Sequence, residues 1–222
     1  MAIDAVLFDI DGTLLVTGGA GAVAWQRAFA EQWGVEANIE EHTRAGMTDP
    51  EIAEIVFRDV LGRDGSEEER GRAIKGYLSH LADAVAESAG YRLMPGITET
   101  LERLTDQGVL LGIVTGNIEP AAEIKLARGE LNRFFSFGGY GSDSRDRTEL
   151  TRRAVERGGE VRGTPLDPAA TIAVGDTPRD VKAGHGAGIR VVGVATGSYT
   201  VEEQRQAGAD WPISDVTQGF PL

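Results

Sequence analysis

Residues 5–14 read Ala-Val-Leu-Phe-Asp-Ile-Asp-Gly-Thr-Leu, and this stretch decides the fold. Its apolar start predicts a buried strand near residues 4–9, which runs into two carboxylates, Asp9 and Asp11. A regular strand would point these two side chains to opposite faces. Gly12 lets the chain leave the strand, so that a turn can bring Asp11 back over Asp9. We therefore expect two carboxylates at the carboxyl edge of a parallel strand, where α/β folds place their ligands.

The second half of the chain alternates apolar segments with polar, helical ones. Further strands are expected near residues 109–115, 134–138, 171–175 and 190–194, with a weaker one near 211–213. Helices are expected near residues 97–107, 119–129, 147–158, 179–187 and 200–207. This alternation predicts an α/β fold with a doubly wound parallel sheet and helices on both of its faces.

A helical segment interrupts this pattern after the first strand. Apolar spacing and capping residues predict helices near residues 22–33, 50–61 and 66–88, and no strand among them. We expect two domains, a helical bundle formed by residues 17–91 and an α/β domain formed by residues 1–16 and 92–222. Glycine-rich residues 17–21 have the composition of a hinge between them.

Composition limits the partners and the location of the chain. It has 222 residues, 22 basic and 35 acidic side chains and a net charge of −13. This charge argues against nucleic acid and anionic membranes as partners, so an anionic substrate would need local positive charge, for which a divalent cation is the obvious source. Without cysteines, disulfides and thiolate metal sites are excluded. With no leader or membrane segment apparent, we expect a cytoplasmic protein, as a monomer or small homo-oligomer.

Three strand-end motifs carry a resemblance to a known family. Asp-Ile-Asp-Gly-Thr-Leu at residues 9–14, Leu-Leu-Gly-Ile-Val-Thr-Gly-Asn at 110–117 and Thr-Ile-Ala-Val-Gly-Asp-Thr-Pro-Arg-Asp at 171–180 stand in order along the chain. They resemble motifs I, II and IV of the haloacid dehalogenase-like superfamily. The resemblance implies a Rossmann-like core, a helical cap inserted between motifs I and II, and phosphatase activity similar to that of phosphoglycolate phosphatases.

The resemblance also implies roles for the motif residues. Asp9 corresponds to the nucleophile, Asp11 to the acid and base, and Thr115 to a phosphate ligand. Backbone amides at Gly12, Gly116 and Asn117 would hold phosphate oxygens. Mg²⁺ would bind Asp9, Asp176 and the backbone carbonyl of Asp11, with Asp180 as an orienting partner or a helix-dipole acid.

The basic residue of motif III has no clear counterpart here, because the family's usual lysine is missing. Arg145 and Arg147 are both candidates, and a helix start beside Asp146 favours Arg147 slightly. Lys125, the remaining candidate, is expected to be solvated or salt-bridged. In the cap, Arg44 is considered as a second anion anchor, with a surface position as the alternative.

These assignments predict Mg²⁺-dependent hydrolysis of a small phosphate monoester through an aspartyl-phosphate intermediate. Asp11 favours an ester over a halide, because an alkoxide leaving group needs a proton. A β-phosphoglucomutase-like phosphotransferase shares the same core motifs and stays an alternative. A non-catalytic binding module of the same fold is a second alternative, favoured only by the missing lysine.

Overall fold

The structure is a computed structural model that describes residues 3–36, 38–218 and 220. Six parallel strands form one sheet in the order β5-β4-β1-β6-β7-β8. The strands are β1 (Ala5–Phe8), β4 (Leu110–Val114), β5 (Phe137–Gly139), β6 (Thr171–Gly175), β7 (Arg190–Val194) and β8 (Trp211–Ile213). The chain runs outward from β1 to β5 on one side and restarts at β6 on the other, which creates a topological switch point beside β1.

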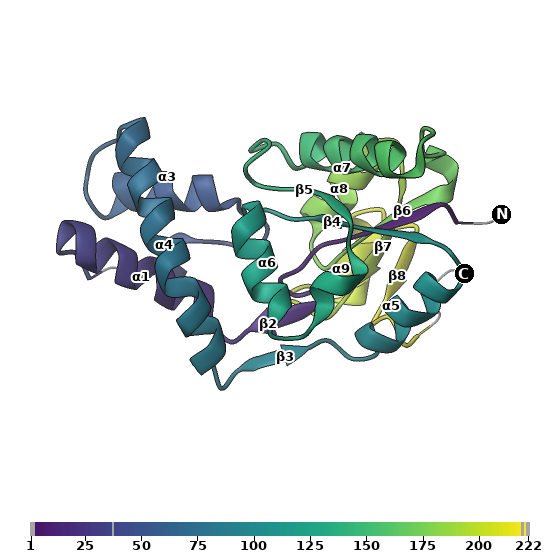
Figure 1. Ribbon diagram of the computed structural model, residues 1–222, viewed down its shortest axis with the longest axis horizontal. Helices are drawn as coiled ribbons and strands as arrows, with labels where there is room; N and C mark the ends of the chain where they lie inside the picture. Colours follow the sequence, from purple (N-terminus) through teal and green to yellow (C-terminus); the bar gives the residue numbers. More distant parts are fainter. Residues whose placement is uncertain (1–2, 37, 219, 221–222) are drawn as a thin grey trace.

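Helices cover both faces of this sheet, as Figure 1 shows. They are α5 (Ile97–Asp106), α6 (Glu119–Ala127), α7 (Arg147–Arg162), α8 (Pro178–Gly186) and α9 (Val201–Gln206). Successive side chains of β1 point to opposite faces of the sheet, which explains the two layers of helices. Phe8 packs in the cluster that holds α5 and α6, whereas Leu7 packs in the cluster that holds α7 and α8. The predicted α/β fold with a doubly wound parallel sheet is thus confirmed.

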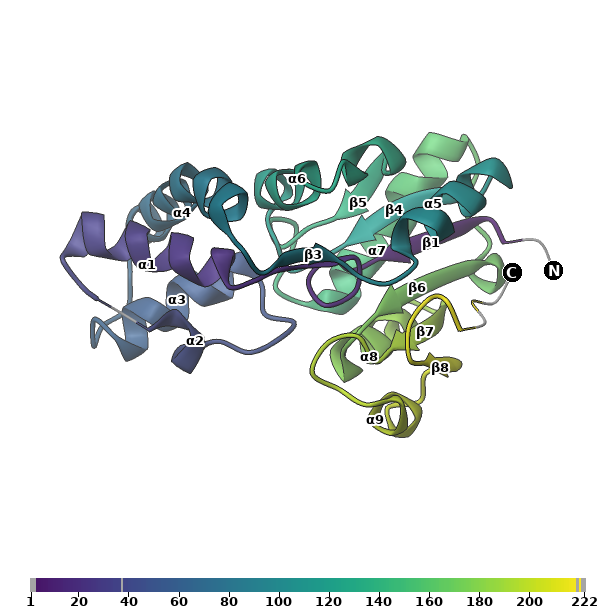
Figure 2. The ribbon, with the colours of Figure 1, turned by 90° about the horizontal axis from the view of Figure 1, so that it is seen from below.

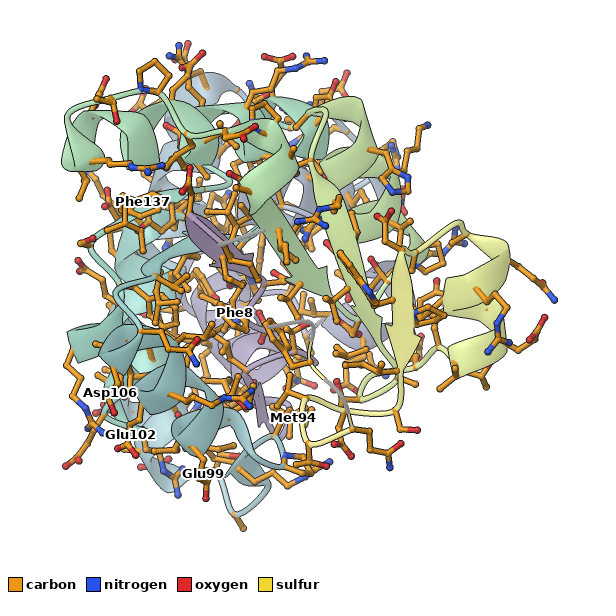
Figure 3. The ribbon with its side chains drawn as sticks, turned by 90° about the vertical axis from the view of Figure 1, so that its right-hand side faces the viewer. Phe8, Met94, Glu99, Glu102, Asp106 and Phe137 are labelled. Atoms are coloured by element: carbon orange, nitrogen blue, oxygen red, sulfur yellow. The ribbon has the colours of Figure 1, made fainter. Side chains whose placement is uncertain are left out.

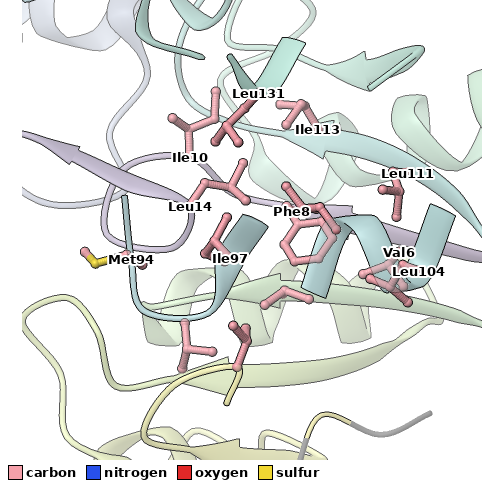
Figure 4. Close-up of a cluster of buried hydrophobic side chains, with 14 of the residues drawn as sticks. Val6, Phe8, Ile10, Leu14, Met94, Ile97, Leu104, Leu111, Ile113 and Leu131 are labelled. Atoms are coloured by element: carbon pink, nitrogen blue, oxygen red, sulfur yellow. The ribbon is translucent and has the colours of Figure 1, made fainter. Parts of the chain in front are cut away.

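Helix α5 illustrates how the sequence builds these layers. Its apolar residues, Leu101 and Leu104 among them, are fully buried in the cluster drawn in Figure 4. Its acidic residues Glu99, Glu102 and Asp106 are exposed and lie on the outer surface in Figure 3. This division along a 3.6-residue period is that of a surface helix packed on a core.

Four helices between β1 and β4 lie apart from the sheet in Figure 1. They are α1 (Ala20–Trp33), α2 (Ile39–His42), α3 (Asp49–Asp59) and α4 (Glu67–Glu87). Capping boxes start α3 at Thr48 and α4 at Ser66. Their aromatic side chains share a buried cluster that extends to Ile118 and Ala121 beside the sheet. Among the described residues, no helix is long and apolar enough to cross a membrane.

Two short strands connect these helices to the sheet. β2 (Leu15–Thr17) and β3 (Tyr91–Leu93) pair antiparallel, and Figure 2 shows them side by side between the two groups of helices. Neither strand is predicted from the sequence. Both domain boundaries expected from it, at residues 16/17 and 91/92, fall inside this pair, so the division into core and cap stays an interpretation. The strand expected near residues 134–138 begins only at Phe137, because Leu131–Phe134 form a 3₁₀ helix, η1.

Candidate active site

Three polar residues follow three neighbouring strands at the carboxyl edge of the sheet. Asp9 comes directly after β1, Thr115 after β4 and Asp176 after β6. The register pairs Phe8 with both Ile113 and Val174, so these strands end level with one another. Less than a tenth of the surface of each polar residue is exposed. The three strand-end motifs therefore meet beside the switch point, where an α/β sheet binds ligands.

The turn after β1 folds across the end of β6. Gly12 has a φ of 87°, and a Cβ atom built on it would lie 2.5 Å from Oδ2 of Asp176. A side chain at this position would be strained and would also collide with the carboxylate. The hydroxyl of Thr13 donates to Oδ1 of Asp176 at 3.3 Å. Gly12 therefore lets the backbone of the turn approach the Asp176 carboxylate closely.

An acidic cluster forms at this edge from Asp9, Asp176 and Asp180, with one carboxylate oxygen of each within 4.8 Å of the others. Burial raises the pKa of Asp9 to about 7, and the charges of Asp180 and Asp11 add to this rise. Burial also raises the pKa of Asp176 to about 8, with repulsion from Asp9 and Asp180 as the further cause. Carboxylates held this close repel one another, so the cluster favours a cation.

Arg147 supplies positive charge to this cluster from the first turn of α7, which Asp146 caps. Its Nη2 atom donates to Oδ1 of Asp180 and lies 3.5 Å from Oδ2 of Asp9. Burial alone would lower the pKa of Arg147, but the charges of Asp180 and Asp9 outweigh burial and raise it. Arg145 points elsewhere, because its side chain pairs with Glu54 of α3 at the surface. Of the two arginines considered for motif III, Arg147 is the one beside Asp9.

Both carboxylate oxygens of Asp180 accept hydrogen bonds from other residues. Oδ1 accepts from Arg147, and Oδ2 accepts from the backbone and hydroxyl of Thr177 at 3.0 and 2.7 Å. The bond from the backbone N–H of Thr177 belongs to the capping box of α8, in which the N–H of Asp180 also donates to the Thr177 hydroxyl at 3.3 Å. Asp180 therefore orients Arg147 and starts a helix, which leaves Asp9 and Asp176 as the carboxylates with room for a metal ion.

A second network surrounds Asp11, whose side chain is 45% exposed. Its Oδ2 atom accepts from Nζ of Lys125 at 2.7 Å and from Nδ2 of Asn117 at 2.8 Å. Both the backbone N–H and the Nδ2 of Asn117 donate to Oγ1 of Thr115, at 3.2 and 2.8 Å. The amide of Asn117, expected to face a phosphate, thus binds Thr115 in this structure. Lys125, which was expected to be solvated or salt-bridged, is salt-bridged and buried.

The cap approaches this edge through the start of α3. The N–H of Asp49 donates to the carbonyl of Gly116 at 2.9 Å, and Oδ2 of Asp49 accepts from the N–H of Ile118 at 2.8 Å. A Cβ atom on Gly116 would lie 2.3 Å from the carbonyl oxygen of Met47, so the two loops touch. Burial raises the pKa of Asp49 to about 6. Sequence reasoning missed Asp49, which reads there as an ordinary helix cap.

These elements enclose a cavity of about 290 Å³ between the sheet edge and the cap. Asp9, Asp11 and Arg147 line its floor, together with Thr115 and Lys125. Its cap wall includes Trp25 and Tyr77, whose rings stack 4.3 Å apart, and the exposed Arg44 at the loop before α3. A small molecule in this cavity would contact the carboxylates at the sheet edge and the side chains of the cap at the same time.

Comparison with known proteins shows which family the chain resembles. A sequence model of the haloacid dehalogenase-like hydrolases matches residues 6–194. A phosphoglycolate phosphatase of Synechococcus elongatus is 29% identical, covering 96% of this chain and 95% of its own. An N-acetylmuramic acid 6-phosphate phosphatase of Pseudomonas aeruginosa is 28% identical over 95% of this chain and 90% of its own. The structure of a predicted phosphoglycolate phosphatase from Haemophilus somnus has a similar fold, with a TM-score of 0.74 and 22% identity over 96% of this chain and 94% of that one.

Proposed function

Because the chain belongs to the haloacid dehalogenase-like hydrolases, we propose that it hydrolyses a small phosphate monoester through a phosphoenzyme formed on Asp9. The observation that carries this proposal is the convergence of Asp9, Asp11 and Arg147 on one cavity. A nucleophile, a proton carrier and a cation are the groups that phosphoryl transfer requires. Relatives named as phosphatases over nearly the whole chain support the reaction class.

The proposed reaction has two steps. In the first, a carboxylate oxygen of Asp9 bonds to phosphorus while the ester oxygen leaves and takes a proton from Asp11. In the second, Asp11 takes a proton from water, the water oxygen bonds to phosphorus, and the bond to Asp9 breaks to release phosphate. Arg147 offsets negative charge at Asp9 throughout. Its Nε–H is buried with no partner among the described residues, so the guanidinium keeps a donor for a phosphate oxygen.

Magnesium is the metal that these residues fit. Asp9 and Asp176 offer buried carboxylates, and the backbone carbonyl of Asp11 would add a third oxygen, which is the ligand type that Mg²⁺ prefers. Burial and mutual repulsion raise the pKa values of Asp9 and Asp176, and a bound cation would favour their ionised forms. When bound, the ion would neutralise the charge on the nucleophile and the transferring phosphate. Asp180 would keep Arg147 in place.

Thr115 and the backbone amides at Gly12 and Gly116 would hold the phosphate oxygens. The amide of Asn117 would join them only after leaving the Thr115 hydroxyl, to which it donates here. The ester's other half would lie against the cap wall. The cavity of about 290 Å³ suits a metabolite of a few to about a dozen non-hydrogen atoms, and Arg44 would favour an acidic one such as phosphoglycolate.

Phosphate release tests this proposal directly. Wild-type protein is incubated with phosphoglycolate, sugar phosphates and nucleotides, with Mg²⁺ or EDTA, beside the variant Asp9→Asn. Turnover that needs Mg²⁺ and is lost in the variant supports the proposal. Absence of release from every ester would contradict it. Phosphate passed to a second sugar hydroxyl instead of water would point to the phosphotransferase alternative.

A further inference from the structure

Lys125 is a buried lysine in a chain that has three lysines in all. It lies on the inner face of α6, in register with the buried residues Ala121, Ala122 and Leu126. Only 6% of its surface is exposed. A buried ammonium is costly unless it is paired, so its position on an otherwise apolar helix face needs a reason.

The reason is a closed ring of three side chains. Nζ of Lys125 donates to Oδ2 of Asp11 at 2.7 Å and to Oδ1 of Asn117 at 2.6 Å. Nδ2 of Asn117 donates to the same Oδ2 atom of Asp11 at 2.8 Å. Both donors are buried, whereas Asp11 is half-exposed. Two buried donors therefore hold one carboxylate oxygen of Asp11 in place.

The other carboxylate oxygen of Asp11, Oδ1, has a different environment. Among the described residues, no hydrogen bond to Oδ1 is found, and Asp11 lines the cavity. Two donors therefore fix the position of Oδ2, and Oδ1 stays available to exchange a proton with a bound molecule. Asp11 stands on a turn, where a half-exposed side chain would otherwise populate several rotamers.

We propose that Lys125 is a positioning residue that acts through Asp11. It holds Oδ2, with Asn117 as the second clamp, so that Oδ1 is aimed at the leaving oxygen and then at the attacking water. This inference rests on the proposed function. Proton transfer needs the two heavy atoms within hydrogen-bond reach, and small misplacements of a catalytic group are costly.

Two other roles for Lys125 make different predictions. A motif III role would place its ammonium on Asp9, but Arg147 occupies that position and Lys125 contacts Asp11. Direct binding of the substrate would use the third donor of Nζ, because the other two serve Asp11 and Asn117. Loss of that contact would raise KM, whereas loss of positioning lowers kcat without raising KM.

The substitution Lys125→Met tests the inference, because it keeps the length of the side chain and removes its charge. The probe is p-nitrophenyl phosphate with Mg²⁺, since p-nitrophenolate leaves without a proton. Rapid mixing separates the first release of p-nitrophenolate from the later steady state, in which water must be deprotonated. We expect the first phase to stay within about threefold of wild type and the steady state to fall about 10²-fold. An alkyl phosphate should lose about 10²-fold already in its first turnover.

A double-mutant cycle shows whether the effect passes through Asp11. In the background Asp11→Asn, Lys125→Met should cost less than about threefold in the steady-state rate, because the group that it positions is already lost. Equal losses in both backgrounds, or a raised KM, would overturn the inference. Lys75→Met is the matched control, since Lys75 is exposed on α4, and it should keep wild-type rates.

Folding and activity are read separately. Thermal unfolding is measured for each variant, and Lys125→Gln, which retains a neutral donor, replaces Lys125→Met if the latter does not fold. Gln should then show the same loss in steady state with the first phase retained. A wild-type protein that hydrolyses no ester overturns the proposed function and this inference with it. An active wild type with unaffected Lys125 variants overturns this inference alone.

Discussion

Nη2 of Arg147 lies 3.5 Å from Oδ2 of Asp9, and the same nitrogen donates to Asp180. All three side chains are more than nine-tenths buried. The arginine thus offsets part of the negative charge of two largely buried carboxylates. Removing it would leave both of them without a protein cation in contact, which affects stability and chemistry together.

We predict that Arg147→Met lowers kcat for phosphate release by about 10²- to 10³-fold, because the variant has no guanidinium to offset the negative charge of Asp9 and the phosphate. The free energy of unfolding should fall by about 3 kcal/mol, as for other broken buried pairs. Steady-state kinetics and urea unfolding measure the two effects. Arg145→Met is the control, because its exposed pair with Glu54 is worth no more than about 1 kcal/mol. Full activity in the Arg147 variant would contradict this prediction.

The strand-end residues could be placed from the sequence because parallel strands bring their carboxyl ends to one edge. Asp9, Thr115 and Asp176 follow three apolar runs, and that pattern alone brings them together. The contact between Lys125 and Asp11 depends on how α6 is rotated against the turn after β1, which periodicity within one helix does not give. A signal was present, because Lys125 shares a helix face with Ala121, Ala122 and Leu126.

The same reasoning explains what was missed in the fold. β2 and β3 have three residues each and come from segments more than 70 residues apart, so neither shows a periodic pattern. Phe134, Phe135 and Phe137 read as one apolar strand, but the first of them ends the helix η1. Asp49 shows the limit for the site, since its contact with Ile118 joins the starts of α3 and α6, which only the packing of the cap brings together.

Metal dependence of stability should change with pH. The pKa values of Asp9 and Asp176 are raised to about 7 and about 8, so the stability that their protonated forms contribute is present at low pH and is lost as pH rises through those values. Mg²⁺ requires the ionised forms and should restore stability there. We predict that saturating Mg²⁺ stabilises by about 3 kcal/mol near pH 9 and by much less near pH 6.

Thermal unfolding with Mg²⁺ and with EDTA across this pH range measures the effect. Asp176→Asn should remove most of the difference between the two, because it deletes a ligand and a charge. Asp106→Asn on the outer face of α5 changes the net charge equally and should leave the difference intact (Figure 3). A Mg²⁺ effect that is independent of pH would argue against binding at this cluster.

Titration of Asp49 should give the free energy of unfolding a separate pH dependence at lower pH. Because its pKa is raised from 3.8 to about 6, chiefly by burial, its contribution to stability is full below about pH 4 and is lost as pH rises through 6. The shift corresponds to about 3 kcal/mol at most. Asp49→Asn keeps an acceptor for the N–H of Ile118 and removes the charge. The stability of wild type minus that of this variant should therefore fall between about pH 4 and pH 7.

Asp49→Ala separates the hydrogen bond from the charge. It leaves the N–H of Ile118 without its acceptor, which should cost about 1 to 3 kcal/mol at every pH. Urea unfolding of the three proteins at several pH values measures both effects. Parallel stability curves for wild type and Asp49→Asn would show that the carboxyl titrates normally.

The contact between Gly116 and the cap loop should set how closely the cap approaches the site. A methyl group on Gly116 would meet the carbonyl oxygen of Met47 at 2.3 Å, so Gly116→Ala must push the loop away and strain the bond from the N–H of Asp49. We predict a loss of about 1 to 3 kcal/mol in the free energy of unfolding and a KM raised several-fold, because the cavity between cap and sheet edge widens.

Gly71→Ala is the matched control. Gly71 lies inside α4, and beyond its own turn of the helix no described atom lies within 4 Å of the added methyl, so alanine there should stabilise by about 0.5 to 1 kcal/mol and leave KM unchanged. An unchanged KM in Gly116→Ala would mean that the cap loop can shift without altering how the substrate binds.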